Sequence, residues 1–202
     1  SIGVINVSIG GCSIDLFDED KASAYIAKSA DWLQNFCKAY DNHPYQRLVA
    51  MAKEAQKAGV IKGILLHQGC TDNGQRDWPE RVKVVYDRLL NDLGLEAEQC
   101  PLLVGELVSQ QDNGTCWLHN SVIATIPLVI PTAYVVPSLG CPGNFDKLHF
   151  TAAGYRELGK RYAEVMLRAE KNCSESGKKA KAGKKSGKKA KAGKKSGKKS
   201  KK

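Results

Sequence analysis

The first 170 residues alternate short apolar runs with longer segments in which apolar residues recur every three or four positions. The apolar runs predict buried strands over residues 2–8, 60–66, 102–107 and 132–137. The periodic segments predict helices over residues 22–40, 44–59, 78–93, 116–126 and 151–169. Strands that alternate with helices of this length form βαβ units, so the sequence predicts an α/β fold with a parallel sheet that helices cover on both faces.

A carboxylate and an imidazole follow the last predicted strand, at Asp146 and His149. Their three-residue spacing lets one turn aim both side chains at the same point. In a hydrolase, a histidine held in this way takes the proton of a nucleophile, while the carboxylate orients the ring and stabilises its cation. The pattern alone is weak evidence, because a turn histidine bonded to an aspartate for stability alone has the same spacing.

Two upstream segments also follow predicted strands. Residues 7–12 contain the pair Gly10-Gly11, and residues 66–72 contain a His-Gln-Gly sequence. Open α/β sheets bind ligands at the carboxyl ends of their strands, so we expect these segments to lie near Asp146 and His149. The Asp-Asn-Gly sequence that begins at Asp72 has the composition of a simple turn.

The last 29 residues differ in composition from the rest of the chain. Residues 174–202 contain 14 Lys and one Glu, whereas residues 1–173 contain 17 basic and 20 acidic side chains. The positive formal charge of +10 therefore comes from the tail alone. Residues 176–185 recur unchanged at 186–195. We predict a domain over residues 1–172 and a disordered Lys-rich tail over residues 173–202. The tail either binds anionic polymers non-specifically or is a solubilising extension without a specific partner.

The seven cysteines include no Cys-x-x-Cys pair and no Cys/His spacing typical of zinc, so no metal site is predicted. Cys12 and Cys141 both fall in loops of the predicted site, and a disulfide between them is one possibility. No run of 18 apolar residues occurs, so no transmembrane helix is expected. The sequence also shows no signal peptide.

Four segments in this order and at these distances resemble the SGNH-hydrolase superfamily: residues 7–14, 62–69, 102–106 and 146–162. Within it they are most similar to the family-6 carbohydrate esterases, the group of acetylxylan esterases and sialate O-acetylesterases. The resemblance covers residues 2–168 and implies a three-layer, flavodoxin-like fold. It also implies hydrolysis of acetyl esters on polysaccharides or sugars, a secreted or periplasmic location, and no metal or organic cofactor.

The resemblance assigns a role to each candidate site residue. His149 is the general base and then the acid for the leaving sugar hydroxyl, and Asp146 orients it. The backbone amide of the Gly10-Gly11 turn donates to the oxyanion, since glycine lets the backbone approach closely. Gln68 is the expected side-chain donor. Thr71 is the alternative, depending on how the Gly-x-Asn-Asp block of the superfamily aligns with this loop.

Two departures from the family pattern matter. The family usually has Glu after its Gln-Gly pair, where this chain has Cys70, so an orienting carboxylate is absent. The family's nucleophilic Ser follows its first strand in a Gly-Gln-Ser-Asn-like motif, which this sequence does not contain. In the sheet of the family, that first strand lies between the strand that matches residues 2–8 and the strand that matches residues 60–66. We therefore expect a sheet without its first strand, a chain incomplete at its N-terminus, and a nucleophilic Ser outside it. Ser8, Ser13 and Cys70 are the alternatives within the chain.

A second hypothesis belongs to a different functional class. A domain without its nucleophile can serve as a catalytically inactive binding module, with the Lys-rich tail as its contact surface for anionic polymer. The coding sequence upstream of Ser1 separates the two hypotheses, because the esterase needs a Gly-Gln-Ser motif there.

Overall fold

The computed structural model describes residues 1–171, and the predicted disorder of the Lys-rich tail concerns residues outside that range. The chain divides into two compact units, Ser1–Met166 and Leu167–Lys202. In the second unit, residues 167–171 are helical. Within residues 1–171, no helix is both long enough and apolar enough to cross a membrane.

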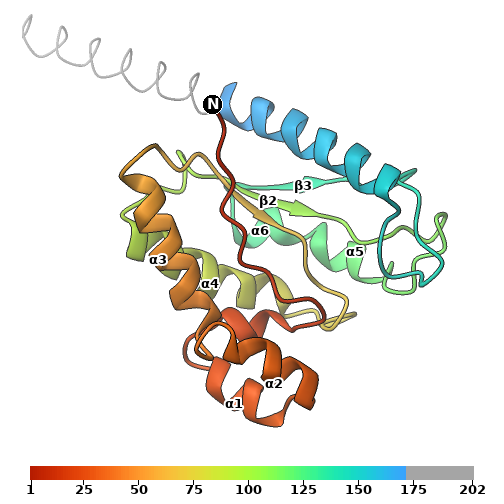
Figure 1. Cartoon of the computed structure of the whole chain (residues 1–202). Coiled ribbons are helices and arrows are strands. Elements are labelled where there is room, and N and C mark those ends of the chain that lie inside the picture. Colours follow the sequence, from red (N-terminus) through yellow and green to blue (C-terminus); the bar gives the residue numbers. More distant parts are fainter. Residues whose placement is uncertain (172–202) are drawn as a thin grey trace, which may run out of the picture. The chain divides into compact units, whose positions relative to one another are not determined.

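A parallel sheet lies at the centre of the first unit (Figure 1). Its strands β1 (Ile64–Leu66), β2 (Leu102–Gly105) and β3 (Ala133–Val136) are arranged in the order β1-β2-β3. This confirms the predicted α/β class and three of the four predicted strands, each shorter than its apolar run. β2 is central and buried along its whole length, which explains its uninterrupted apolar sequence.

Helices cover both faces of the sheet, so the unit has three layers. Side chains of β2 alternate between the layers: Leu103 packs with Leu158 and Val165 of the helix formed by residues 152–171. Leu102 and Val104 point to the opposite face. There they pack with α4 (Trp78–Leu93), α5 (His119–Ile123) and α6 (Ile126–Val129).

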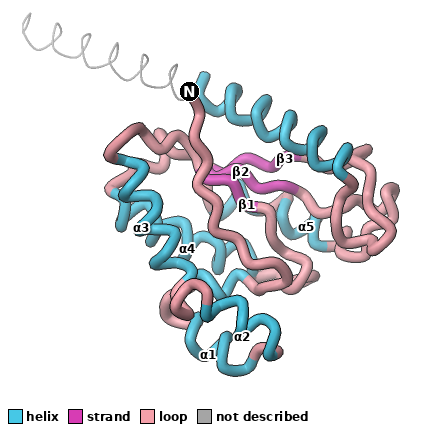
Figure 2. Tube along the Cα trace, viewed as in Figure 1, coloured by secondary structure: helices cyan, strands magenta, loops and turns pink. Residues whose placement is uncertain are grey.

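The predicted strand at residues 2–8 is wrong. Residues 1–9 form no strand, and Figure 2 shows this segment as loop. Ile2 and Val4 are 97% and 81% exposed. A strand needs a neighbour to pair with, and within the described part of the chain this segment has none. β1 likewise pairs only with β2, so its other edge is free of ladder partners among residues 1–171.

Two predicted helices are each divided in two. The segment 22–40 forms α1 (Ala22–Lys28) and α2 (Asp31–Lys38), because Ser29 is extended and its hydroxyl donates to the Tyr25 carbonyl. The segment 116–126 contains α5 and, at Ile126, the first residue of α6, so Pro127 does not end a helix but lies in the first turn of α6.

The remaining helices follow the prediction more closely. α3 (Pro44–Gln56) and α4 both carry Pro in their first turn. The short helix η1 (Ile14–Phe17) packs with α1 and α2 around a small apolar cluster of its own, which includes Ile9, Cys12, Leu16, Leu33 and Cys37. This cluster supports the chain that runs into the Gly10-Gly11 turn.

Candidate active site

Asp146 and His149 form a closed turn in the loop after β3. One carboxylate oxygen of Asp146 accepts the backbone N–H groups of His149 and Leu148, at 2.9 and 3.0 Å. The other oxygen lies 2.8 Å from Nδ1 of His149. These bonds, first those from the backbone, lower the pKa of Asp146 to about 2. The carboxylate is therefore ionised at neutral pH and keeps a proton on Nδ1.

The other ring nitrogen of His149 is available for chemistry. The side chain is 64% exposed, and Nε2 has no hydrogen-bond partner among residues 1–171. A neutral imidazole with Nδ1 bonded to a carboxylate has its basic lone pair on Nε2. The turn thus leaves one ring nitrogen of His149 unbonded within the described range, in the loop after the carboxyl end of β3.

The glycine turn and the loop after β1 are joined by direct hydrogen bonds. The Thr71 hydroxyl donates to the Gly11 carbonyl at 2.8 Å, and Nε2 of Gln68 donates to the Cys12 carbonyl at 2.9 Å. Gly11 has φ of +71°, and an added Cβ would lie 3.0 Å from the ring of Trp32. Both features favour glycine at this position. The N–H groups of Gly10 and Gly11 have no hydrogen-bond partner within the described range.

The amide of Gln68 is fully used inside the protein. Besides Cys12, its Nε2 donates to Asp72 at 2.6 Å, and its Oε1 accepts the indole N–H of Trp78 at 2.7 Å. Trp78 is completely buried. An oxyanion would therefore receive a hydrogen bond from Gln68 only if one of these internal bonds were given up.

Asp72 is the centre of a buried polar network that sequence reasoning missed. It was expected in a simple turn, and it does lie in one, but it is only 1% exposed. Its oxygens accept bonds from the Ser13 hydroxyl, the Ile14 N–H, the Gln68 amide and Arg81, at 2.7, 2.9, 2.6 and 3.1 Å. One carboxylate thus ties η1 to the loop after β1 and to α4.

His119 packs against the same loop. The sequence around His119 did not indicate this contact. The side chain is fully buried, and burial lowers its pKa, so the ring is neutral. Its Nδ1 accepts the Gly74 N–H at 3.3 Å. An added Cβ on Gly69 would lie 2.4 Å from the ring, so the close approach of His119 requires glycine there.

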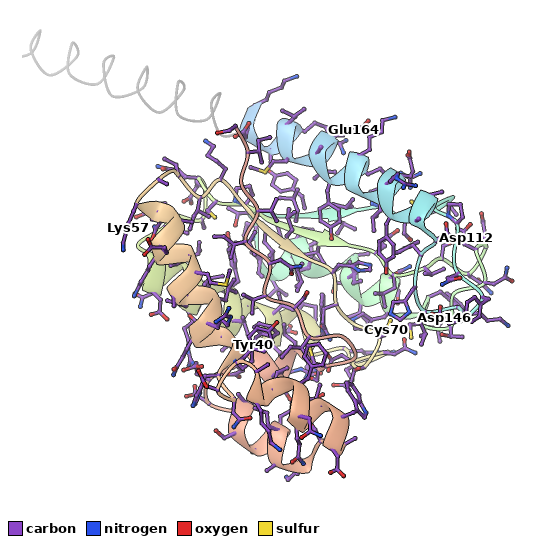
Figure 3. All side chains as sticks on the ribbon, in the orientation of Figure 1. Tyr40, Lys57, Cys70, Asp112, Asp146 and Glu164 are labelled. Carbon is purple, nitrogen blue, oxygen red and sulfur yellow. The ribbon has the colours of Figure 1, made fainter. Side chains whose placement is uncertain are left out.

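The His149 turn contacts the loop after β1 directly through Phe150 and indirectly through Thr115 and Cys116. The rings of Phe150 and His67 lie 5.7 Å apart, centroid to centroid. The N–H and hydroxyl of Thr115 both donate to the Lys147 carbonyl, at 2.9 and 3.2 Å. The neighbouring Cys116 thiol lies 3.8 Å from the Cys70 carbonyl. Cys70 and Asp146, labelled in Figure 3, therefore belong to adjoining loops.

A family model described as carbohydrate esterase, sialic acid-specific acetylesterase, matches residues 1–168. The chain belongs to this carbohydrate esterase family. The chain is also similar to the crystal structure of a protein from Arabidopsis thaliana, with 25% sequence identity and a TM-score of 0.53. That match covers 62% of this chain and 52% of the other, so the chain spans about half the length of the solved structure.

The esterase family uses a nucleophile, and none of the three candidates within the chain is bonded to His149. Ser8 is exposed and donates to Asn6 at 2.8 Å. Ser13 is buried and donates to Asp72. Cys70 lies beside Cys116, whose thiol is 3.8 Å from the Cys70 carbonyl. Among residues 1–171, the ring nitrogens of His149 are hydrogen-bonded to Asp146 alone.

Proposed function

We propose that this protein is the base-bearing part of a carbohydrate O-acetylesterase that uses a Ser/His/Asp mechanism. The observation that carries the proposal is the His149 ring, which is held at Nδ1 by an ionised carboxylate and is open at Nε2. Membership of the carbohydrate esterase family supports acetyl esters of sugars as the substrate class. The reaction needs no metal or organic cofactor.

In this mechanism Nε2 of His149 takes the proton of a serine hydroxyl as the serine oxygen attacks the acetyl carbonyl. The tetrahedral intermediate collapses when His149 returns the proton to the sugar oxygen, which leaves as an alcohol. Water then attacks the acetyl-enzyme by the same proton transfers, and acetate is released. Asp146 stays ionised throughout and stabilises the imidazolium.

The oxyanion is best served by the N–H groups of Gly10 and Gly11, which have no partner among residues 1–171. Gln68 and Thr71 then act by holding the turn, because their donors are bonded to the carbonyls of Cys12 and Gly11. Backbone donors held before the reaction do not have to reorient as charge develops.

The nucleophilic Ser is proposed to lie outside the 202 residues of this sequence, on a strand that pairs with the free edge of β1. Leu65 in the middle of β1 is 59% exposed, and the apolar side chains of residues 2–8 are left without a strand to join. The unpaired backbone groups along this edge of β1 favour the addition of a strand. Such a strand would end at the same edge of the sheet as His67 and Gln68.

Hydrolysis of p-nitrophenyl acetate tests the proposal. It is measured on the 202-residue chain and on a form that also contains the translated upstream coding sequence. We expect turnover only in the longer form. There His149→Ala should lower kcat by about 10²- to 10⁴-fold, the usual contribution of a general base. His43→Ala, an exposed histidine before α3, is the matched control.

Unchanged turnover in His149→Ala would refute the assigned base. Absence of turnover in the longer form would favour the other hypothesis, an inactive module that binds anionic polymer through its basic tail. Retention of that form on heparin at physiological salt would then support the binding module.

A further inference from the structure

Two cysteines from different loops meet beside the candidate site. Cys70 follows Gly69 in the loop after β1, and Cys116 lies just before α5. The Cys116 thiol lies 3.8 Å from the Cys70 carbonyl, and both side chains pack against the same apolar cluster. Both residues are partly exposed, whereas the other four described cysteines are buried: Cys12, Cys37, Cys100 and Cys141.

We propose that Cys70 and Cys116 form a disulfide when the protein meets a small-molecule disulfide such as oxidised glutathione. The Cys116 thiolate attacks one sulfur of the oxidant and releases one glutathione thiolate. Cys70 then loses its proton to water and attacks the Cys116 sulfur, which releases the second. Two protein thiols are oxidised by two electrons, and one oxidant molecule is reduced to two thiols.

The surroundings favour a disulfide over the other uses of paired thiols. Within residues 1–171, no third His, Cys, Asp or Glu is placed to hold a metal ion with them. Desolvation raises the pKa of the Cys70 thiol, so little of it is thiolate at neutral pH and a nucleophilic role is disfavoured. The same shift slows the second step, in which Cys70 attacks the Cys116 sulfur.

The proposed bond joins the two halves of the candidate site. Next to Cys70, the Thr71 hydroxyl holds the Gly11 carbonyl. Next to Cys116, Thr115 donates twice to the Lys147 carbonyl, inside the turn that positions His149. A bond between the two cysteines thus fixes the glycine turn relative to the His149 turn. This consequence, unlike the bond itself, rests on the proposed function.

The full chain is incubated with glutathione at oxidising and at reducing ratios, free thiols are alkylated, and tryptic peptides are identified by mass spectrometry. We expect one cross-linked peptide pair containing Cys70 and Cys116 in the oxidised sample alone. Closing a chain loop of about 45 residues should raise the Tm of the oxidised chain by about 5 to 15 °C.

Two variants sharpen the test. Cys116→Ser should abolish the cross-link, while Cys141→Ser, a buried cysteine of a different apolar cluster, should leave it intact. Full alkylation of Cys70 and Cys116 in the oxidised, folded chain would overturn the proposal. So would a cross-link between Cys12 and Cys37 in their place, since those two also lie near each other in one cluster.

The proposed disulfide and the proposed esterase mechanism can be refuted independently of each other. His149→Ala should form the same disulfide as the unsubstituted chain, because within residues 1–171 no hydrogen bond joins the ring of His149 to either cysteine. In an active form of the enzyme, oxidation should raise kcat/KM when the bond positions the site. An unchanged kcat/KM with a formed cross-link would limit the disulfide to a stabilising role.

Discussion

Replacement of Asp72 by Asn tests whether the buried network holds the site together. Four donors surround the carboxylate, from Ser13, Ile14, Gln68 and Arg81. An asparagine has the same shape, but it offers one acceptor oxygen and turns an NH₂ group toward groups that are themselves donors. The substitution therefore removes the charge that faces Arg81 and leaves donors unsatisfied in a buried place.

The expected loss of unfolding free energy in Asp72→Asn follows from the burial of the ion pair. Removing one partner of a buried ion pair costs about 3–5 kcal/mol. Arg81 is only 12% exposed but keeps a second carboxylate, Asp15, at 3.2 Å. We therefore expect the lower end of that range, about 3 kcal/mol.

Asp77→Asn is the matched control, because it changes the same residue type beside the same arginine. Asp77 lies 3.5 Å from Nε of Arg81 but is 71% exposed, so solvent screens the pair. Its loss should cost about 0–1 kcal/mol. Urea unfolding followed by circular dichroism gives the unfolding free energy of both variants. Their midpoints are compared provided that their denaturant m-values are equal. Equal midpoints for the two variants would refute the central role of Asp72.

Two further predictions concern the glycine turn and the Asp146 carboxylate. Gly11→Ala forces a side chain into a left-handed backbone and against Trp32, so it should cost about 1–2 kcal/mol in thermal unfolding. Gly10→Ala, with no atom within 4 Å of the new Cβ, should change stability by less than about 0.5 kcal/mol, and equal losses would argue against the strain. The pKa of Asp146, followed by carbon-13 NMR, should lie near 2, so its stabilising effect is present at neutral pH and is lost as the pH falls toward 2. In His149→Ala that pKa should rise only in part, since two backbone N–H bonds remain, and a value of about 3.8 in the unsubstituted chain would contradict the structure.

The sequence predicted those features that depend on local chemistry. β2 was evident because a strand buried on both faces must be apolar at every position. The Asp146–His149 bond was evident because both groups lie in one turn. The adjacency of the Gly10-Gly11 turn to the loop after β1 was expected from a strand at residues 2–8 that the structure does not contain; hydrogen bonds from Thr71 and Gln68 hold the turn there instead.

Features that depend on distant partners were not predictable in this way. Asp72 reads as an ordinary turn residue, and its burial depends on Ser13, which is 59 positions away in sequence. The apolar run at residues 2–8 reads as a strand, but a strand exists only where another strand pairs with it. The meeting of Cys70 with Cys116 likewise depends on two loops that the sheet brings together.

The two halves of the site are held in physically different ways. The glycine turn is anchored by a buried carboxylate, whose bonds open only when the surrounding core opens. The His149 turn is held by bonds that are largely exposed to water, so it belongs to the part of the molecule that opens at lower free energy. Catalysis by the proposed mechanism needs both halves at a fixed separation, since a displacement of about 1 Å costs about 10²-fold in rate. A covalent bond between Cys70 and Cys116 would restrain this separation, because it would link the loop that holds the glycine turn to the segment that contacts the His149 turn.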